Sequence, residues 1–467
     1  MKKLIYTLLF VLISVAANGQ QAKYVFYFIG DGMGVNQVNG TEMYQAELQN
    51  GRIGVEPLLF TQFPVATMAT TFSATNSVTD SAAAGTALAT GKKTYNSAIS
   101  VGEDKNPIET VAEKAKKAGK KVGVTTSVSV DHATPAAFYA HQADRNMNYE
   151  IAVDLTKANF DFYAGGGFLK PDKTYDKKDA PNIFPIFEEA GYTVARGYSD
   201  YKAKSKDAGK MILIQEEGKD PSCLPYAIDR KDNDLTLAQI TESAIDFLTK
   251  GKNKGFFLMV EGGKIDWACH ANDAATVFNE VKDMDNAIKV AYEFYKKHPK
   301  ETLIVVTADH ETGGIVLGTG KYALNLKALQ HQKHSADGLS KRISELRKSK
   351  GNKVTWEDMK TFLGEEMGFW KQFPISWEQE KKLRDEFEKS FIKNKVVFAE
   401  SMYSKSEPMA ACAKEVMDEI SMVGWVSGGH SAGFVPVFAI GAGSHLFSEK
   451  IDNTEIPKRI AKAAGYK

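Results

Sequence analysis

Short apolar runs that end in glycine or an acidic residue constrain the fold of this chain more than any other feature. Residues 24–29 lead directly into Gly30-Asp31-Gly32, and residues 256–260 lead into Glu261-Gly262-Gly263. Runs of this length are typical of buried strands that end in loops. The same pattern recurs in three further segments, residues 122–126, 303–307 and 435–440. The sequence therefore predicts a set of buried strands, each followed by a loop that can carry polar side chains.

Helix-prone stretches separate these apolar runs. Residues 108–118, for example, carry lysines on one face and end at Gly119. Strands that alternate with helices are typical of α/β proteins, in which helices cover both faces of a parallel sheet. We therefore expect one large, mostly parallel central sheet in a three-layer sandwich. Ligands of such sheets bind beyond the carboxyl ends of the strands, so functional residues are expected there.

The segment 322–422 differs from the rest of the chain because it is charged, helix-prone and poor in strand signals. Its clearest helical stretches are residues 340–350 and 377–393. We interpret it as a helical subdomain inserted into a catalytic domain of residues 20–467. A solvated helical elaboration is the favoured interpretation, and a role in substrate choice or dimer contact is the alternative.

Overall composition excludes several classes of protein. Of the 467 residues, 43% are hydrophobic and 25% are charged, as in ordinary soluble domains with a substantial core. The formal net charge of +1 provides no global field for nucleic acid or an anionic membrane, so an anionic substrate must be attracted locally. The chain has three cysteines, which are too few for a disulfide framework: Cys223, Cys269 and Cys412. The sequence allows either one disulfide bridge or unpaired thiols.

The first nineteen residues have the pattern of a signal peptide. Lys2 and Lys3 precede the apolar residues 4–16, and small or polar residues follow up to Gly19. The apolar run is shorter than the roughly 20 residues that a membrane span needs. We expect cleavage near Gly19 and an exported protein, periplasmic or secreted, without a membrane span after cleavage. An uncleaved N-terminal anchor is the alternative.

Ser81 opens a run of very small residues that continues to Gly91. A helix with such small side chains can pack closely against other backbone. Its amino end presents unpaired N–H groups and a positive dipole, which favour an anion beside Ser81. Taken alone, this pattern is more typical of a capped, tightly packed helix, so the interpretation depends on the other polar residues of the chain.

Acidic, hydroxyl and imidazole side chains follow several of the predicted strands. Imidazole mixed with carboxylate suits zinc, whereas carboxylates with a hydroxyl and water suit magnesium. Asp266 and His270 are four residues apart, a spacing that places two ligands on one face of a helix. The candidate metal ligands are Asp31, His132, Thr134, Glu261, Asp266, His270, Asp309, His310 and His430.

In chain order, these motifs resemble those of the alkaline phosphatases. Residues 78–86 (VTDSAAAGT) resemble the nucleophile signature of that family. The other matching segments are residues 28–34, 131–136, 260–270, 307–310 and 429–430. The resemblance spans roughly residues 23–320 and 422–447, and it implies the sandwich fold of this family and the hydrolysis of phosphate monoesters.

The resemblance also implies two zinc ions and one magnesium ion. Asp266, His270 and His430 would hold one zinc ion. Asp309, His310 and Asp31 would hold the second zinc ion next to Ser81. Magnesium would lie among Asp31, His132, Thr134 and Glu261, with His132 acting directly or through water.

Catalysis in the resembling family implies a covalent phosphoserine. Ser81 would attack phosphorus, the alcohol would leave, and water would then release inorganic phosphate. Arg145 matches the family's phosphate-binding arginine, and its planar guanidinium can contact two phosphoryl oxygens at once. The implied substrates are phosphate monoesters of broad range, in keeping with phosphate scavenging, while the natural substrate and a homodimer remain open.

Two residues near the implied magnesium site differ from some bacterial relatives. His132 stands where those relatives have aspartate, and Trp267 stands where they have lysine. Loss of a cation should weaken retention of phosphate, and loss of a carboxylate should loosen magnesium. We hypothesise faster phosphate release and greater dependence on added magnesium; simple wall packing is the alternative role for Trp267.

Two other classes of function remain open from sequence. A phosphodiesterase, phosphoglycerate mutase or sulfatase could be built on a similar metal-bearing sheet, although the surroundings of Ser81 differ from theirs. A non-catalytic exported phosphate scavenger or adhesion protein, acting through the charged insertion, is the second alternative. Activity on a monoester, a diester and a sulfate ester of nitrophenol separates these classes.

Overall fold

The computed structural model describes residues 21–49, 51–251, 254–320, 322–351 and 353–467. The predicted signal peptide, residues 1–19, lies outside these ranges, so its cleavage stays a prediction. Within the described ranges, no helix is both long enough and apolar enough to cross a membrane.

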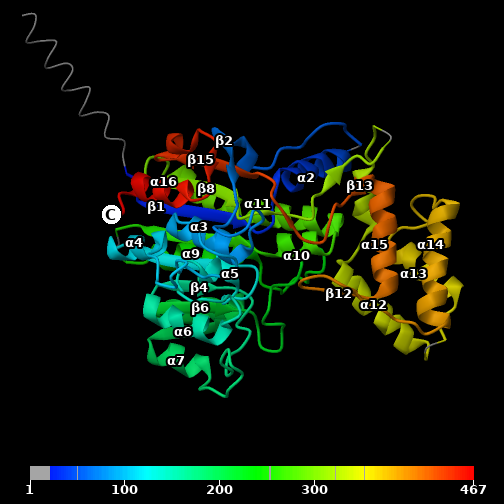
Figure 1. Cartoon of the computed structure of the whole chain (residues 1–467), viewed down its shortest axis with the longest axis horizontal. Helices are drawn as coiled ribbons and strands as arrows, with labels where there is room; N and C mark the ends of the chain where they lie inside the picture. Colours follow the sequence, from blue (N-terminus) through cyan, green and yellow to red (C-terminus); the bar gives the residue numbers. More distant parts are fainter. Residues whose placement is uncertain (1–20, 50, 252–253, 321, 352) are drawn as a thin grey trace, which may run out of the picture.

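A ten-stranded sheet forms the centre of the molecule (Figure 1). Its order is β16-β2-β15-β8-β1-β7-β3-β4-β6-β5, and β15 alone runs antiparallel to its neighbours. The strands are β1 (Tyr24–Gly30), β2 (Val65–Thr70), β3 (Lys121–Thr126), β4 (Phe162–Ala164), β5 (Tyr192–Arg196), β6 (Lys210–Ile214), β7 (Phe256–Gly262), β8 (Thr302–Ala308), β15 (Val435–Gly441) and β16 (Ile451–Asp452). All five strands predicted from apolar runs are therefore confirmed.

The central strands β1, β7 and β8 are buried along their whole length. Burial on both faces explains why their sequences are continuous apolar runs and do not alternate. Phe26 packs against Phe294 of helix α11 (Ala274–Lys297), while its neighbour Tyr27 packs against Phe138. Because successive strand residues point to opposite faces, α11 and the segment around Phe138 cover opposite sides of the sheet. The predicted layers are confirmed.

The helices around the sheet are mostly short. They are α2 (Val35–Leu48), α3 (Ser81–Thr90), α4 (Val111–Lys117), α5 (Ala133–Ala136), α6 (Asn148–Ala158), α7 (Ile183–Glu189), α8 (Tyr198–Lys204), α9 (Leu237–Leu248), α10 (Lys264–His270), α11 (Ala274–Lys297) and α16 (Glu455–Ala464). Short 3-10 turns occupy Phe60–Gln62 and Ser444–Phe447. Helix α4 starts three residues later than the predicted 108–118, because Thr110 and Glu113 form a capping box that fixes its first turn.

Charged helices fill the segment between β10 (Val316–Leu317) and β13 (Val423–Gly424), and they lie to one side of the sheet (Figure 1). They are η2 (Leu326–His331), α12 (Ala336–Ser349), α13 (Trp356–Glu366), α14 (Trp377–Phe387), the π-helical turn η3 (Glu388–Ile392) and α15 (Pro408–Ser421). The helices predicted at 340–350 and 377–393 are thus present. A hairpin of β11 (Ala399–Glu400) and β12 (Lys405–Ser406) leaves these helices and reaches back toward α10 (Figure 1).

The three cysteines are unpaired thiols. Cys269 and Cys412 are buried, whereas Cys223 is half-buried with its Sγ atom 3.1 Å from Lys264 Nζ. Of the two possibilities left open by the sequence, the structure has the one without a bridge.

Candidate metal centre

The candidate ligands converge because their strands end at the same edge of the sheet. In the parallel register, Ile29 of β1 lies beside Glu261 of β7, and Gly30 lies beside Ala308 of β8. Asp31 and Asp309 follow immediately after β1 and β8, so both carboxylates reach the region beyond the strand ends. These two candidate ligands therefore lie beyond the carboxyl ends of the strands, where the sequence analysis expected ligand-binding residues.

The first cluster surrounds the Ser81 hydroxyl. Asp31, Asp309 and His310 each offer a ligand atom, and these atoms lie within 4.8 Å of one another. His310 Nε2 is 3.3 Å from Asp31 Oδ1, 3.3 Å from Asp309 Oδ2 and 3.2 Å from Ser81 Oγ. All four side chains are fully buried. The residues that the sequence assigned to the zinc position next to Ser81 therefore do come together.

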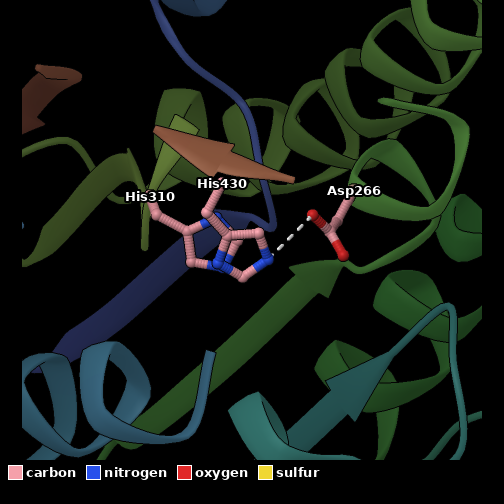
Figure 2. Close-up of side chains that lie close together, drawn as sticks. All are labelled: Asp266, His310 and His430. Carbon is pink, nitrogen blue, oxygen red and sulfur yellow. Dashed lines mark ion pairs between the residues drawn. The ribbon is translucent and has the colours of Figure 1, made fainter. Parts of the chain in front are cut away.

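The second cluster contains Asp266, His310 and His430, whose ligand atoms also lie within 4.8 Å of one another. Figure 2 shows the rings of His310 and His430 stacked, with Asp266 facing the ring of His430; its dashed line marks the 3.8 Å contact from His430 Nε2 to Asp266 Oδ1. His270 belongs to the same place, since its Nε2 atom is 3.3 Å from Asp266 Oδ2 and 3.2 Å from His430 Nε2. The predicted trio of Asp266, His270 and His430 is therefore assembled.

His430 arrives at this cluster through a short ladder. Strand β14 (His430–Ser431) pairs with β9 (Glu311–Thr312), which places His430 opposite Thr312. Its Nδ1–H donates to the carbonyl oxygen of Thr79 at 2.8 Å, and the Nδ1–H of His270 donates to Gly428 O at 2.6 Å. These hydrogen bonds leave a lone pair on each Nε2 and point it into the cluster, as in metal-binding histidines.

The third cluster contains Asp31, His132 and Glu261, again with ligand atoms within 4.8 Å of one another. Thr134, on the short helix α5, lies beside it with Oγ1 3.4 Å from Asp31 Oδ2. The hydroxyl of Thr126 donates to Glu261 Oε2 and orients that carboxylate. The oxygen-rich set predicted for magnesium is thus gathered in one place.

The nitrogen and oxygen atoms of these clusters are suited to bind divalent cations, because many of them lack a hydrogen-bond donor within the clusters. His270 Nε2 and His430 Nε2 face each other at 3.2 Å although both carry lone pairs. Four buried carboxylate oxygens of these clusters accept no hydrogen bond from the described residues: Asp31 Oδ1, Glu261 Oε1, Asp266 Oδ2 and Asp309 Oδ2. Buried anionic oxygens without donors are costly unless they bind a metal. The residues therefore match the implied zinc and magnesium.

Burial and mutual repulsion disturb the ionisation of the carboxylates. Burial, followed by the charges of neighbouring carboxylates, raises the pKa values of Asp31 and Asp309 well above the usual range. Burial also raises the pKa of Glu261 to about 7. Although burial opposes its ionisation, Asp266 has a lowered pKa because the imidazole of His270 lies beside it. Groups so strongly perturbed in one cavity are typical of functional sites.

Ser81 is the first residue of α3, and Asp80 caps this helix by accepting a hydrogen bond from Ala83 N at 2.9 Å. The Ser81 hydroxyl therefore lies at the positive end of the helix. The small side chains let α3 approach α5 closely, because a Cβ atom built on Gly85 would lie only 3.3 Å from Thr134 Cα. The predicted close packing of this helix is confirmed, and it joins the Ser81 helix to the helix that carries Thr134.

Arg145 contacts both Asp80, the residue before Ser81, and His132 of the third cluster. Its Nη1 atom donates to Asp80 Oδ2 at 3.2 Å, and its Nη2 atom donates to the hydroxyl of Tyr403 at 3.0 Å. The same Nη2 atom is 3.4 Å from His132 Nε2. Although burial opposes it, electrostatic attraction by the Tyr403 oxygen and the Asp80 carboxylate raises the pKa of Arg145, so the guanidinium stays positively charged. This cation balances part of the negative charge of the carboxylates.

Three residues near the clusters were not among the predicted site residues. Asp80 holds Arg145, and Thr312 Oγ1 donates to Asp266 Oδ1 at 2.6 Å while lying 3.2 Å from His310 Nδ1. Asp80 could have been found as an acidic N-cap directly before Ser81. Tyr403 gives no such signal, because it lies in the charged insertion and far from every motif.

Trp267 lines the same region from α10. Its exposed fraction is 8%, its ring stacks on Tyr403 with centroids 4.8 Å apart, and its edge contacts His132. The ammonium of Lys264 lies near two aromatic rings, 4.7 Å from the centre of the Trp267 ring and 3.4 Å from the centre of the Tyr226 ring. Trp267 therefore forms a wall beside the clusters, as its packing alternative expects.

Together, buried carboxylates and imidazoles around a serine hydroxyl, at the carboxyl ends of a mostly parallel sheet, are typical of an α/β enzyme with a metal-binding active site. The family model for alkaline phosphatase matches residues 22–466 of this chain. The chain therefore belongs to the alkaline phosphatase family, and it is an enzyme that hydrolyses phosphate monoesters.

Relatives of known name or structure agree with this assignment. Alkaline phosphatase 3 of Bacillus subtilis (strain 168) is 36% identical, with 96% of this chain and 90% of that protein aligned. Alkaline phosphatase 4 of the same strain is 34% identical, with 94% and 88% aligned. A cold-active alkaline phosphatase from Shewanella sp. has 29% identity and a TM-score of 0.79, covering 94% of this chain and 99% of that one. The alkaline phosphatase of the Antarctic bacterium TAB5 has 28% identity and a TM-score of 0.66, covering 96% and 99%.

Proposed function

We propose that Ser81 is the nucleophile of this phosphatase and that its oxygen becomes the carrier of a covalent phosphoryl group. The observation that supports this most directly is the position of Ser81 Oγ, 3.2 Å from His310 Nε2 and at the amino end of α3. Attack of Oγ on phosphorus forms a serine–phosphate bond and releases the alcohol. Water then breaks that bond, so Ser81 is restored and inorganic phosphate leaves.

Arg145 orients the phosphoryl group in this proposal. Its guanidinium is fixed by Asp80, which is also the N-cap of the helix that begins with Ser81. The phosphate-binding cation and the nucleophile are thus held by the same carboxylate, and their separation is set before substrate binds. A planar guanidinium suits two phosphoryl oxygens better than an ammonium does.

The proposed metal content is two zinc ions and one magnesium ion per chain. Asp266, His270 and His430 would hold one zinc ion, and Asp31, Asp309 and His310 would hold the other. When bound, these ions would supply the positive charge that ionises the Ser81 hydroxyl and stabilises the departing oxygen. The Nε2 lone pairs of His270 and His430, which are directed into the second cluster, support zinc there.

Magnesium is proposed for the third cluster, where Asp31, Glu261 and Thr134 supply hard oxygen atoms and His132 contributes through a water molecule or directly. A variant of the TAB5 enzyme with histidine replaced by aspartate has Mg bound in its M3 site. That relative supports magnesium as the ion of a corresponding third site in this chain.

The decisive experiment compares the wild-type enzyme with Ser81→Ala. The wild type should hydrolyse a nitrophenyl phosphate monoester much faster than the diester or the sulfate ester, and Ser81→Ala should lose at least about 10⁴-fold in kcat. Acid quenching during turnover, followed by mass spectrometry, should find phosphate on the peptide that contains Ser81. Ser349→Ala, at an exposed serine of α12, is the matched control and should keep full activity. A Ser81→Ala enzyme with normal turnover would overturn the covalent route.

The domain organisation and location are also part of the proposal. Residues 1–19 would be a cleaved signal peptide, and residues 20–467 a catalytic domain interrupted by the insertion 322–422. The enzyme would act outside the cytoplasm on a broad range of monoesters, which supplies phosphate to the cell. N-terminal sequencing of the exported protein tests the cleavage site.

A further inference from the structure

We propose that Tyr403, delivered by the helical insertion, is a positioning residue that sets how tightly Arg145 holds phosphate. The sequence favoured a solvated elaboration for this insertion, with a role in substrate choice or dimer contact as the alternative. The structure instead brings the Tyr403 hydroxyl to 3.0 Å from Arg145 Nη2. The inference rests on the proposed phosphate-binding role of Arg145. It implies that the insertion supplies a residue of the phosphate-binding site.

Tyr403 lies at the tip of the hairpin formed by β11 and β12. Ala399 pairs with Ser406 and Glu400 pairs with Lys405, so residues 401–404 form the connecting turn. This turn is closed by hydrogen bonds from Ser401 N to Ser404 O at 2.8 Å and from Ser404 N to Ser401 Oγ at 3.1 Å. The tip therefore has a defined shape from which the tyrosine ring projects.

The hairpin is anchored to the helices of the insertion. The buried hydroxyl of Ser404 donates to Asp337 in the first turn of α12. Immediately after β12, Glu407 caps α15 and also accepts a hydrogen bond from Arg347 Nη2 at 3.0 Å. These contacts tie the place of Tyr403 to α12 and α15, so the insertion determines where the hydroxyl lies.

Three rings of the site fix the orientation of the Tyr403 ring. It stacks on Trp267 with centroids 4.8 Å apart and planes 12° from parallel. The ring of His132 lies 5.8 Å away at 63°, and that of His270 lies 5.4 Å away at 67°. Stacked and edge-to-face contacts of this kind favour one ring orientation. The hydroxyl is consequently directed at Arg145 by contacts that do not involve Arg145 itself.

The hydrogen-bonding pattern gives the hydroxyl a specific task. Arg145 Nη1 is held by Asp80 and Nη2 by Tyr403, so the two ends of the guanidinium have separate partners on opposite sides. Because Arg145 donates to it, the Tyr403 oxygen acts as an acceptor and its own proton can be donated elsewhere. No described residue accepts that proton. A phosphoryl oxygen bound to Arg145 is the acceptor that this arrangement suits.

The test separates the hydroxyl from the ring. Tyr403→Phe keeps the stacking on Trp267 but removes the contact with Arg145, whereas Tyr403→Leu removes both. For Tyr403→Phe we expect the inhibition constant of inorganic phosphate and the KM for nitrophenyl phosphate to rise together, by about tenfold, because a hydrogen bond to a charged group is lost. The value of kcat should not fall, since Ser81 and the metal ligands are untouched. Tyr403→Leu should show a larger rise.

Tyr322→Phe is the matched control, because Tyr322 is fully exposed and lies in the same insertion; its phosphate inhibition should equal that of the wild type. Calorimetric titration of the metal-loaded proteins with inorganic phosphate checks the same affinities without turnover. A Tyr403→Phe enzyme with wild-type phosphate affinity, or with a lowered kcat and melting temperature but unchanged affinity, would show that Tyr403 is merely structural. Either result would leave the hydrolysis by the wild type, and therefore the proposed function, intact.

Discussion

His132 provides the sharpest prediction for a single residue. Its imidazole contributes no negative charge to a cluster in which Asp31 and Glu261 are the carboxylates. In His132→Asp, a third carboxylate should bind magnesium more tightly, because magnesium prefers hard oxygen ligands. We expect the free magnesium concentration needed for half-maximal activity after chelator treatment to fall by about tenfold or more. Direct titration of magnesium into the chelator-treated protein measures the same quantity without turnover.

His132→Asn is the control, since it changes size in the same way but adds no charge. If the asparagine and aspartate variants required equal magnesium, charge would not explain the behaviour of this position. The companion change Trp267→Lys should tighten inhibition by phosphate, because it adds a second ammonium beside the clusters, where Lys264 Nζ already lies 4.7 Å from the Trp267 ring. Phosphate inhibition that stays unchanged in the double variant would remove the hypothesis of fast phosphate release.

The candidate metal ligands could be predicted from the sequence motifs, but the residues that contact and orient those ligands could not. The nine candidate ligands all lie in or beside the three clusters, and most of them belong to motifs that follow a predicted strand. His430 is different, because it precedes the predicted strand at 435–440. Thr312 and Tyr403 act on those ligands or on Arg145 only through distances that depend on the whole fold. Thr312 is brought in by the β9–β14 ladder and Tyr403 by a hairpin more than a hundred residues beyond Trp267. Neither pairing has a local signal in the sequence.

At the scale of elements, the contact between α3 and α5 links the nucleophile to the magnesium cluster. A Cβ atom on Gly85 would lie 3.2 Å from Ala137 Cβ and 3.3 Å from Thr134 Cα. Gly85→Val should therefore force the helices apart and destabilise the protein by about 1–3 kcal/mol. Because α5 carries Thr134 and begins beside His132, the same change should raise the magnesium requirement. Urea unfolding and magnesium titration measure the two effects.

Gly85→Ala gives the graded comparison. Its single methyl group meets tight contacts, but alanine is also the better helix former by about 1 kcal/mol, so its net effect should be much smaller than that of valine. A valine variant with wild-type stability and magnesium affinity would show that the two helices are not rigidly coupled.

Strands could be predicted from the sequence where burial on both faces gives them a continuous apolar run. Strands β1, β7 and β8 are buried on both faces, and that burial leaves a continuous apolar run in the sequence. Strand β5, at one edge of the sheet, and β2, which lies second from the other edge, are partly exposed and carry mixed sequences, so no apolar run marks them. The antiparallel direction of β15 also has no local signature, because it depends on how the chain returns from the insertion.

For the whole molecule, the metal centre should control stability as well as activity. The three clusters hold four carboxylates with no exposed surface: Asp31, Glu261, Asp266 and Asp309. Bound cations would offset their repulsion only in the folded chain, because the unfolded chain does not bring them together. We therefore expect zinc and magnesium to raise the melting temperature by ~5–10 °C relative to chelator-treated protein. Scanning calorimetry at matched ionic strength measures this difference.

The difference in melting temperature between metal-loaded and chelator-treated protein should grow as pH rises. The directions of the pKa shifts predict this increase. The pKa values of Asp31 and Asp309 are raised well above normal, and that of Glu261 is raised to about 7, by burial and by like charges. Without metal, the folded chain therefore keeps protons that the unfolded chain has released, and stability falls as pH rises from about 4 through 7. Asp266, whose pKa is lowered, is ionised in both the folded and the unfolded chain across this pH range, so it does not add to the pH dependence.

Metal-loaded protein needs Asp31, Asp309 and Glu261 deprotonated, so its stability should not decline as pH rises. The gap in melting temperature between loaded and stripped protein should therefore widen from pH 5 to pH 8. Parallel declines of the loaded and stripped proteins would mean that the carboxylates do not bind the ions.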